Sequence, residues 1–387
     1  MKTNPILELN KLGQSVWLDN INRTLITSGA LQRLIDDGLT GVTSNPTIFE
    51  KAIGESSDYD EEIRRLVSEG SDVAEILDAL MIQDIQRAAD LFRPVYERTE
   101  GDDGFVSIEL NPALAYRTDE TIAAAKALHP RLNRPNVMIK VPSTAEGLPA
   151  IEALTAEGIS INITLLFSLE RYEAVARAYL AGMKRRRERG KTVESIRSVA
   201  SVFVSRIDTT VDRLLEAKIE TAGSEEARKE LKGLLGKVGI ANSKMIYQKF
   251  KEIFQSQAQS QAQGQAQGQA PPDGIPLQKV LWGSTGTKNK NYSDVLYVEE
   301  LIGPNTINTV PPATLAAFRD HGQVRPSLEE DLEGARATLQ KLERLGIDLR
   351  QITRTAQEEG VKAFAASYEK LFASVAAKRQ EMRRKIA

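Results

Sequence analysis

Short runs of apolar, largely β-branched residues alternate along the chain with longer stretches whose apolar positions recur at helical spacing. The short runs predict strands at 15–19, 41–45, 105–110, 136–141, 160–167, 199–205, 279–284 and 306–310. Strands that alternate with helices predict βαβ units and a parallel sheet. Eight such units favour an α/β fold built as a single (β/α)8 TIM-type barrel. A doubly wound sheet is the alternative, but no glycine-rich G-x-G-x-x-G turn follows any strand.

Two segments depart from this alternation. Residues 255–274, QSQAQSQAQGQAQGQAPPDG, contain no aromatic residue and no aliphatic side chain larger than alanine apart from proline, which predicts a flexible Gln/Ala-rich insertion. An interaction tag is the alternative interpretation. From about residue 326 the pattern predicts C-terminal helices, with an apolar stripe at Val361, Phe364, Tyr368, Leu371, Phe372 and Val375. The stripe predicts docking on the body, or a helix across the barrel mouth. We therefore predict one barrel domain over 1–387 with these two additions.

Residues 136–144, NVMIKVPST, place a lysine inside an otherwise apolar strand. Side chains alternate between the two faces of a strand, so Lys140 points away from Val137, Ile139 and Val141. The other strands show the same arrangement: Glu109 opposes Ile108 and Leu110, Asp19 opposes Val16 and Leu18, and Ser160, Asn162 and Thr164 oppose Ile161, Ile163 and Leu165. Apolar faces suit the surrounding helices, so the polar faces are expected to line the barrel interior. Several polar residues lie near strand C-terminal ends, where barrel active sites are found.

Composition narrows the candidate chemistry. The chain has no cysteine and only two histidines, His129 and His321, both in segments predicted as helix ends or loops. This argues against disulfides, thiolate nucleophiles, a Ser-His-Asp triad and a multi-histidine metal site. The net charge of −2 argues against a general nucleic-acid binder, and the basic run 184–191 is typical of a solvated helix end. No run of 18 apolar residues and no signal-peptide pattern occurs, so we expect no membrane partner and a cytoplasmic protein.

A buried lysine among carboxylates has a chemical and a structural interpretation. Burial disfavours the charged amine, and a neutral amine can attack a ketone to form a Schiff base. This chemistry needs a carboxylate to move protons and a second base for the hydroxyl next to the broken bond, but no metal or organic cofactor. The structural alternative is a buried ion pair of Lys140 with Asp19 or Glu109. The recurrence of polar residues on several strands favours the chemical interpretation, since burying them for structure alone is costly.

Five motifs follow one another along the chain: GVTSNPTIFEKAI (41–53), IKVPSTAEGLPAIEAL (139–154), GISINITLLFSLERY (158–172), SVFVSRID (201–208) and LWGSTGTKN (281–289). Together they resemble the transaldolase family, most closely its long bacterial type, and the resemblance covers about residues 10–320. It implies a class I aldolase-type barrel of the non-oxidative pentose phosphate pathway. Such a transferase moves a dihydroxyacetone unit from sedoheptulose 7-phosphate to glyceraldehyde 3-phosphate, giving erythrose 4-phosphate and fructose 6-phosphate. The oligomeric state stays open, with a homodimer among the candidates.

The resemblance also implies residue roles through the matching motifs. Lys140 is the expected Schiff-base lysine, and Asp19 the base whose action opens the carbon–carbon bond. Glu109 is expected to act with Thr164, through a water, in forming and dehydrating the carbinolamine. Positions that hold the donor's hydroxyls or support the site are matched by Thr43, Asn45, Asn162 and Ser201.

The expected phosphate site uses residues beyond the strand ends. Arg206 matches a phosphate-binding arginine of the family, but by alternation it falls on the wrong face relative to Ser201 and Phe203. We therefore expect it just past the strand, where the chain has turned. Shorter transaldolases carry an arginine after strand seven, where this chain offers Lys288. Ser284 and Lys288 are expected to bind phosphate, the lysine as a point charge without a bidentate fork.

Two other functions remain open from the sequence. A related aldolase cleaves fructose 6-phosphate without passing the fragment on, but such relatives are shorter and often carry a tyrosine near the Phe203 position. Phe203 has no hydroxyl to position a hydrolytic water, so the enamine is expected to survive until an acceptor aldehyde arrives. A catalytically silent binding barrel, with the Gln/Ala-rich tract as its contact, is the alternative of a different class.

Overall fold

The computed structural model describes residues 4–254 and 274–386, and within them a closed barrel of parallel strands. Each strand pairs with the next in chain order, and the last returns to the first. The strands are β1 Gln14–Leu18, β2 Gly41–Thr43, β3 Val106–Glu109, β4 Val137–Pro142, β5 Ile161–Leu166, β6 Ser198–Phe203, β7 Gln278–Gly283 and β8 Thr306–Val310. All eight predicted strands are present in this order, so the (β/α)8 barrel prediction is confirmed.

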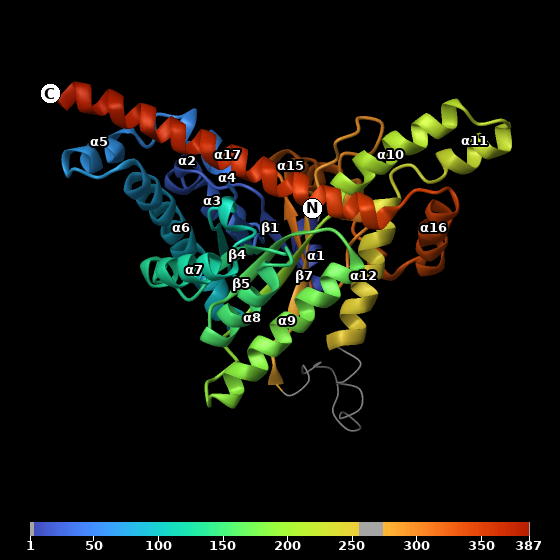
Figure 1. Cartoon of the computed structure of the whole chain (residues 1–387), viewed down its shortest axis with the longest axis horizontal. Coiled ribbons are helices and arrows are strands. Elements are labelled where there is room, and N and C mark those ends of the chain that lie inside the picture. Colours follow the sequence, from blue (N-terminus) through green and yellow to red (C-terminus); the bar gives the residue numbers. More distant parts are fainter. Residues whose placement is uncertain (1–3, 255–273, 387) are drawn as a thin grey trace.

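Helices surround the barrel and extend beyond it (Figure 1). They are α1 Pro5–Lys11, α2 Arg23–Thr27, α3 Ala30–Asp36, α4 Pro46–Gly54, α5 Asp60–Ser68, α6 Val73–Arg98, η1 Pro112–Leu114, α7 Thr118–Leu132, α8 Gly147–Glu157, α9 Leu169–Glu188, α10 Ser205–Glu220, α11 Glu225–Lys232, α12 Val238–Phe254, α14 Leu296–Glu299, α15 Pro312–His321, η3 Ser327–Glu329, α16 Leu332–Arg344 and α17 Leu349–Ile386. Their boundaries follow local chemistry. Asp72 and Glu75, for example, form a reciprocal capping box that satisfies free backbone N–H groups at the start of α6.

The two faces of the strands pack into different clusters. Ile139 and Ile161 belong to the large buried core that also contains Ile151 of α8, as expected for outward-facing strand residues. A separate apolar cluster fills the barrel interior, and its members are Trp17, Phe105, Met138, Val199, Leu281 and Ile307. Met138 and Lys140 share a strand face, so the lysine lies one layer above this plug. This apolar cluster fills the barrel below Lys140, so polar side chains can form a site only above it.

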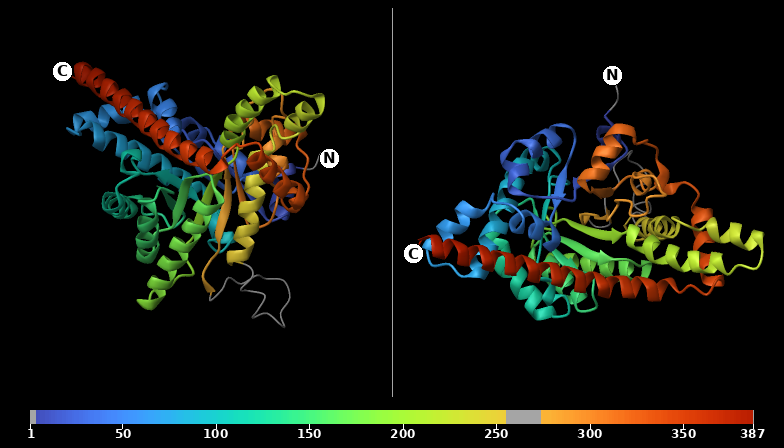
Figure 2. Two further views of the ribbon diagram at one scale, coloured as in Figure 1. Left: turned by 45° about the vertical axis from the view of Figure 1, so that its right-hand side comes forward. Right: turned by 90° about the horizontal axis from the view of Figure 1, so that it is seen from above.

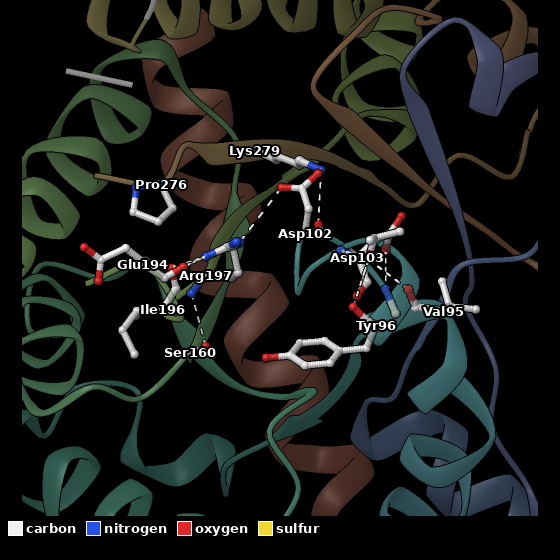
Figure 3. A network of polar contacts seen from close by, with 12 residues as sticks. Val95, Tyr96, Asp102, Asp103, Ser160, Glu194, Ile196, Arg197, Pro276 and Lys279 are labelled. Carbon is white, nitrogen blue, oxygen red and sulfur yellow. Dashed lines mark hydrogen bonds and ion pairs between the residues drawn. The ribbon is translucent and has the colours of Figure 1, made fainter. Parts of the chain in front are cut away.

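Charged residues tie the strands together at their N-terminal ends (Figure 3). Lys279 of β7 lies 2.6 Å from Asp102, which precedes β3, and Arg197, which precedes β6, approaches the same carboxylate at 3.9 Å. The neighbouring Asp103 accepts a hydrogen bond of 2.9 Å from the indole nitrogen of Trp17. These contacts lie at the end of the barrel opposite to that where barrel enzymes carry their active sites, and we assign them a structural role.

The last helix, α17, has 38 residues and runs across the C-terminal ends of the strands (Figures 1 and 2). It contacts α4, α5 and α6 at one side and β5 and α10 at the other. The predicted apolar stripe is buried at Phe364, Leu371 and Val375, so the helix both docks on the body and crosses the barrel mouth. The prediction is wrong at Phe372, whose side chain is 39% exposed.

Strand β5 also corrects the sequence prediction, at its C-terminal end. The register between β5 and β6 shifts between Ile163 and Leu166, and Leu165 adopts a left-handed backbone with φ of 57°. Leu165 therefore leaves the outer core that contains Ile163 and joins a second cluster with Phe364 of α17. The predicted alternation holds up to Thr164 and ends at this bulge, which turns the side chain toward α17.

The Gln/Ala-rich insertion predicted at 255–274 lies outside the described residues except for Gly274. A single domain over residues 1–387 therefore stays a prediction. Across 4–254 and 274–386, no helix combines the length and the apolar character needed to cross a membrane.

Candidate active site

A cavity of about 210 Å³ opens at the C-terminal ends of the strands. It is lined by Asp19, Thr43, Asn45, Thr47, Lys140, Thr164, Ser201, Phe203, Arg206, Leu281, Gly283, Ser284, Lys288, Thr309 and Phe364. Of the site residues predicted from the sequence, Glu109 and Asn162 do not line it and all the others do. The predicted set therefore converges on one place, although its members lie far apart in the chain.

Lys140 lies at the bottom of this cavity and is only 6% exposed. Its position on β4 places it beside Glu109 of β3 and Asn162 of β5 in the strand register. The amine donates a 3.0 Å hydrogen bond to the backbone oxygen of Ser44 and lies 3.7 Å from Glu109 Oε2. The latter separation is that of an ion pair and too long for a hydrogen bond. One oxygen of Glu109 is thus left without a hydrogen-bond partner among the described residues.

The carboxyl groups of Glu109 and Asp19 both have raised pKa values. Burial raises the pKa of Glu109 to about 7, an effect that Lys140 opposes and the nearby Asp19 reinforces. Burial also raises the pKa of Asp19, with opposition from the charges of Lys140 and then Lys288. The part of Asp19 that is not buried faces the cavity. Glu109 can therefore both donate and accept a proton near neutral pH, and it lies beside the Lys140 amine. This arrangement is typical of acid–base catalysis.

Polar side chains around Lys140 fall into two groups. Asn162 bridges three strands below the cavity, since its amide donates to Ser107 Oγ at 3.0 Å and accepts from Ser201 Oγ at 2.6 Å. Thr43 and Thr164 line the cavity and carry buried hydroxyls without a hydrogen-bond partner in the described part of the chain. The first group fixes the geometry of the floor, and the second offers polar atoms to a bound molecule.

Asn45 combines a structural contact with a place in the cavity wall. Its side-chain oxygen accepts a 2.9 Å hydrogen bond from the backbone of Ile48 and caps α4. This bond fixes the side chain and leaves the amide nitrogen as the group available to a ligand.

Cations gather at the outer end of the cavity. Strand β6 ends at Phe203 and α10 begins at Ser205, so Arg206 lies just past the strand as expected. Burial lowers the pKa of this arginine, an effect that Glu359 of α17 opposes. Ser284 directly follows β7 and contacts Ser205 at 3.0 Å, while the exposed Lys288 lies further along the same segment.

The structure adds wall residues that sequence reasoning missed. Thr47 lies within the motif at 41–53, and its hydroxyl lies 2.8 Å from that of Ser367 on α17. The sequence identifies Phe364 only as a member of the tail's apolar stripe, although that stripe is compatible with a helix across the barrel mouth. Its place in the wall depends on where α17 docks, which periodicity alone does not specify.

A larger groove of about 880 Å³ lies between α11, α12 and α16, away from this chemistry. Two of its lysines have protein partners: Lys244 donates to the backbone oxygen of Glu330 at 2.8 Å, and Lys341 lies 3.4 Å from Glu230. The smaller cavity, with its unpaired polar atoms and perturbed carboxylates, is the better candidate for catalysis.

Comparison with known proteins agrees with this geometry. The model of the transaldolase/fructose-6-phosphate aldolase family matches residues 16–375, further into the tail than the motifs suggested. The chain is 42% identical over 378 residues to a transaldolase of Trichodesmium erythraeum, covering 97% of each chain. It is 44% identical over 369 residues to a transaldolase of Thiobacillus denitrificans, covering 95% of this chain and 98% of that one. The chain belongs to the transaldolase/fructose-6-phosphate aldolase family.

Proposed function

We propose that this chain is a transaldolase that moves a dihydroxyacetone unit from sedoheptulose 7-phosphate to glyceraldehyde 3-phosphate through a Schiff base at Lys140. The observation that carries the proposal is a buried amine at the bottom of a polar cavity, close enough to two carboxylates to affect their pKa values, which burial raises. The relatives named transaldolase, similar along nearly the whole chain, support the same activity. The substrates are accordingly sugar phosphates.

The first half of the reaction forms the imine. The neutral Lys140 amine attacks the ketone carbon, and the carbonyl oxygen takes up a proton to give a carbinolamine. Glu109, acting with Thr164 through a water, protonates the carbinolamine hydroxyl, which leaves as water while the nitrogen lone pair forms the C=N bond. Two buried atoms without a hydrogen-bond partner among the described residues support these roles. One is the Glu109 oxygen that lies beside the amine, and the other is the Thr164 hydroxyl in the cavity wall.

The second half breaks and remakes a carbon–carbon bond. Asp19 removes the proton of the hydroxyl on C4, the C3–C4 bond breaks, and its electron pair moves into the protonated imine to form an enamine. Erythrose 4-phosphate leaves, and the enamine attacks the aldehyde carbon of glyceraldehyde 3-phosphate, whose oxygen takes the proton back from Asp19. Hydrolysis of the new imine then releases fructose 6-phosphate. Thr43, Asn45 and Ser201 bind the donor's hydroxyls, and Asn162 supports them from below.

An apolar side chain in the cavity wall at the end of β6 favours transfer of the fragment to an acceptor over simple cleavage. Phe203 packs against Phe167 with ring centroids 5.3 Å apart and brings no hydroxyl into the cavity. No group at this position can orient a water toward the enamine. A catalytically silent barrel is disfavoured because it would not need a proton donor with a pKa of about 7 beside a buried amine.

The test is a coupled assay with sedoheptulose 7-phosphate and glyceraldehyde 3-phosphate, followed by borohydride reduction in the presence of donor alone. We expect formation of fructose 6-phosphate, and covalent trapping of the dihydroxyacetone unit on the protein. Cleavage of fructose 6-phosphate without need of an acceptor would identify the aldolase alternative. Absence of both turnover and trapping would identify a binding barrel.

The substrate phosphate is proposed to bind at Arg206, with Ser284 and Lys288. Among the described residues the Arg206 guanidinium has no hydrogen-bond or ion-pair partner, although its charge is half-buried. Arg206→Ala should lower kcat/KM for phosphorylated ketoses about 10- to 150-fold, the worth of a charge-assisted hydrogen bond, and leave fructose little affected. Lys288→Ala should show the same pattern with a smaller effect because Lys288 is exposed and lacks the fork. An unchanged ratio of phosphorylated to unphosphorylated donor in Arg206→Ala would remove this residue from the phosphate site.

Imine formation should depend on pH through Glu109. Below a pH of about 7 the carboxyl is protonated and can donate to the leaving hydroxyl, and above it the carboxylate can only accept. The single-turnover trapping rate should therefore fall as the pH rises through about 7, because Glu109 loses the proton that it donates. Glu109→Gln should remove this pH dependence and slow trapping about 10²- to 10⁴-fold at pH 6. The comparison is the pH profile of trapping in both proteins, and identical profile shapes would exclude Glu109 as the proton donor.

A further inference from the structure

Helix α17 presents one face to the mouth of the cavity. Gln357, Gly360, Phe364 and Ser367 follow each other at spacings of three or four residues, so they lie on one side of the helix. The amide of Gln357 donates to Ser143 Oγ at 2.8 Å and to the backbone oxygen of Leu165 at 3.0 Å. One turn beyond Phe364, Ser367 contacts Thr47 of the cavity wall. These contacts fix the helix over the ends of β4, β5 and β2.

Gly360 allows this helix to approach the barrel closely. A Cβ at this position would lie 2.8 Å from Leu165 Cδ2 and 3.4 Å from Arg206 Nη1. The first distance is closer than carbon atoms tolerate without displacement, so alanine would require the end of the Leu165 side chain to move. The absence of a side chain at Gly360 therefore leaves room for Leu165 and Arg206 beside α17.

Arg206 lies between two aromatic rings, one from the barrel and one from α17. Its guanidinium carbon lies 5.4 Å from the ring centroid of Phe203 and 6.0 Å from that of Phe364. The rings hold the guanidinium by cation–π attraction without occupying its N–H donors. Because no carboxylate or carbonyl of the described chain engages those donors, they stay available to an anion.

We propose that Phe364 is a positioning residue which, from α17, holds the Arg206 guanidinium against Phe203 and thereby sets the preference for phosphorylated over unphosphorylated donors. The inference rests on the proposed function and deepens it. Without the ring of Phe364, the side chain of Arg206 would gain rotational freedom that phosphate binding must remove again. Phosphorylated substrates would therefore lose more affinity than unphosphorylated ones.

The test compares Phe364→Leu with Phe364→Tyr. Leucine keeps an apolar side chain in the cluster but removes the ring face, and tyrosine restores the ring. Phe364→Leu should lower kcat/KM for fructose 6-phosphate about 2- to 30-fold, mainly through KM, and should lower that for fructose much less. The inhibition constant of inorganic phosphate should rise by the same factor. Phe364→Tyr should recover wild-type values for both.

Gly360→Ala provides an independent variant. Alanine favours helices over glycine, so a weakened α17 cannot explain a loss. It should shift the same ratio of phosphorylated to unphosphorylated donor, because the added methyl group would lie 3.4 Å from Arg206 Nη1 and displace the Leu165 side chain beside it. Phe372→Leu is the matched control, because this phenylalanine lies on the same helix and is 39% exposed. It should leave the ratio unchanged.

A double variant separates action through Arg206 from a general effect on the site. In an Arg206→Ala background, Phe364→Leu should produce no further change in the ratio. Additive losses, equal losses for fructose and fructose 6-phosphate, or an unchanged ratio in Phe364→Leu would each overturn the proposal. Failure of the proposed function would look different: the wild-type protein would turn over neither donor. Calorimetry of inorganic phosphate binding would then still report whether Phe364 acts on Arg206.

Discussion

Lys140→Ala is expected to abolish borohydride trapping and to lower turnover by about 10⁴- to 10⁶-fold, the loss typical of removing a covalent nucleophile. No other amine can replace it, because the next lysine that lines the cavity, Lys288, is exposed at the outer end where the phosphate is proposed to bind. Reduction of the wild-type protein with a ketose phosphate, followed by peptide mapping, should place the label on Lys140. A label on another lysine would refute the assignment.

The same substitution should leave the fold intact. Removing Lys140 deprives Glu109 of its ion-pair partner, but the pKa of that carboxyl is already raised to about 7 and would rise further without the lysine. Glu109 would then become neutral near pH 7 instead of remaining a buried unpaired charge. Lys290→Ala, at an exposed lysine after β7, is the control for the loss of one positive charge. Thermal unfolding of both variants near the wild-type temperature would separate this outcome from a structural ion pair, whose loss should destabilise the barrel markedly.

The barrel could be predicted because each strand is specified by residues that are neighbours in the sequence. Each strand is marked by a short apolar run, and period-two alternation alone places Lys140, Glu109 and Thr164 on the interior face. Closure of the strands in chain order then brings polar residues from distant motifs to one end. Alternation also located Arg206 correctly. It would face away from the interior if β6 continued to it, which indicated that the strand ends before Arg206.

What could not be predicted depends on contacts between distant segments. Leu165 breaks the alternation because β5 carries a bulge there, and nothing in the run SINITLLF signals a left-handed leucine. Phe364 and Phe372 are equivalent in the helical pattern of the tail, yet one lines the cavity and the other is exposed. The difference arises from where α17 docks, and Gln357 contributes to this docking through hydrogen bonds at the ends of β4 and β5.

Asp19→Ala is expected to separate imine formation from carbon–carbon cleavage. Asp19 follows β1 and is held by a backbone hydrogen bond of 2.9 Å to Val310 of β8, so it reaches the cavity from a different strand than Glu109 on β3, with β2 between the two. Without its carboxylate no base takes the C4 hydroxyl proton, and the electron pair of the C3–C4 bond cannot move into the imine. Turnover should fall about 10²- to 10⁴-fold while borohydride still traps the donor at Lys140. Trapping that is lost in Asp19→Ala but kept in Glu109→Gln would show the roles to be reversed.

The pH dependence of this variant series provides a second, independent measurement. A base must be ionised, so cleavage should be lost as pH falls through the pKa of Asp19, which burial raises and the charges of Lys140 and Lys288 lower. Removing one of those charges in Lys288→Ala should move the acidic limb of the kcat profile to higher pH. Lys290→Ala, also an exposed lysine in the same segment, should not move it. High salt should reduce the displacement, since the exposed charge of Lys288 is accessible to screening ions. An acidic limb that stays in place in Lys288→Ala would mean that a group other than Asp19 sets it.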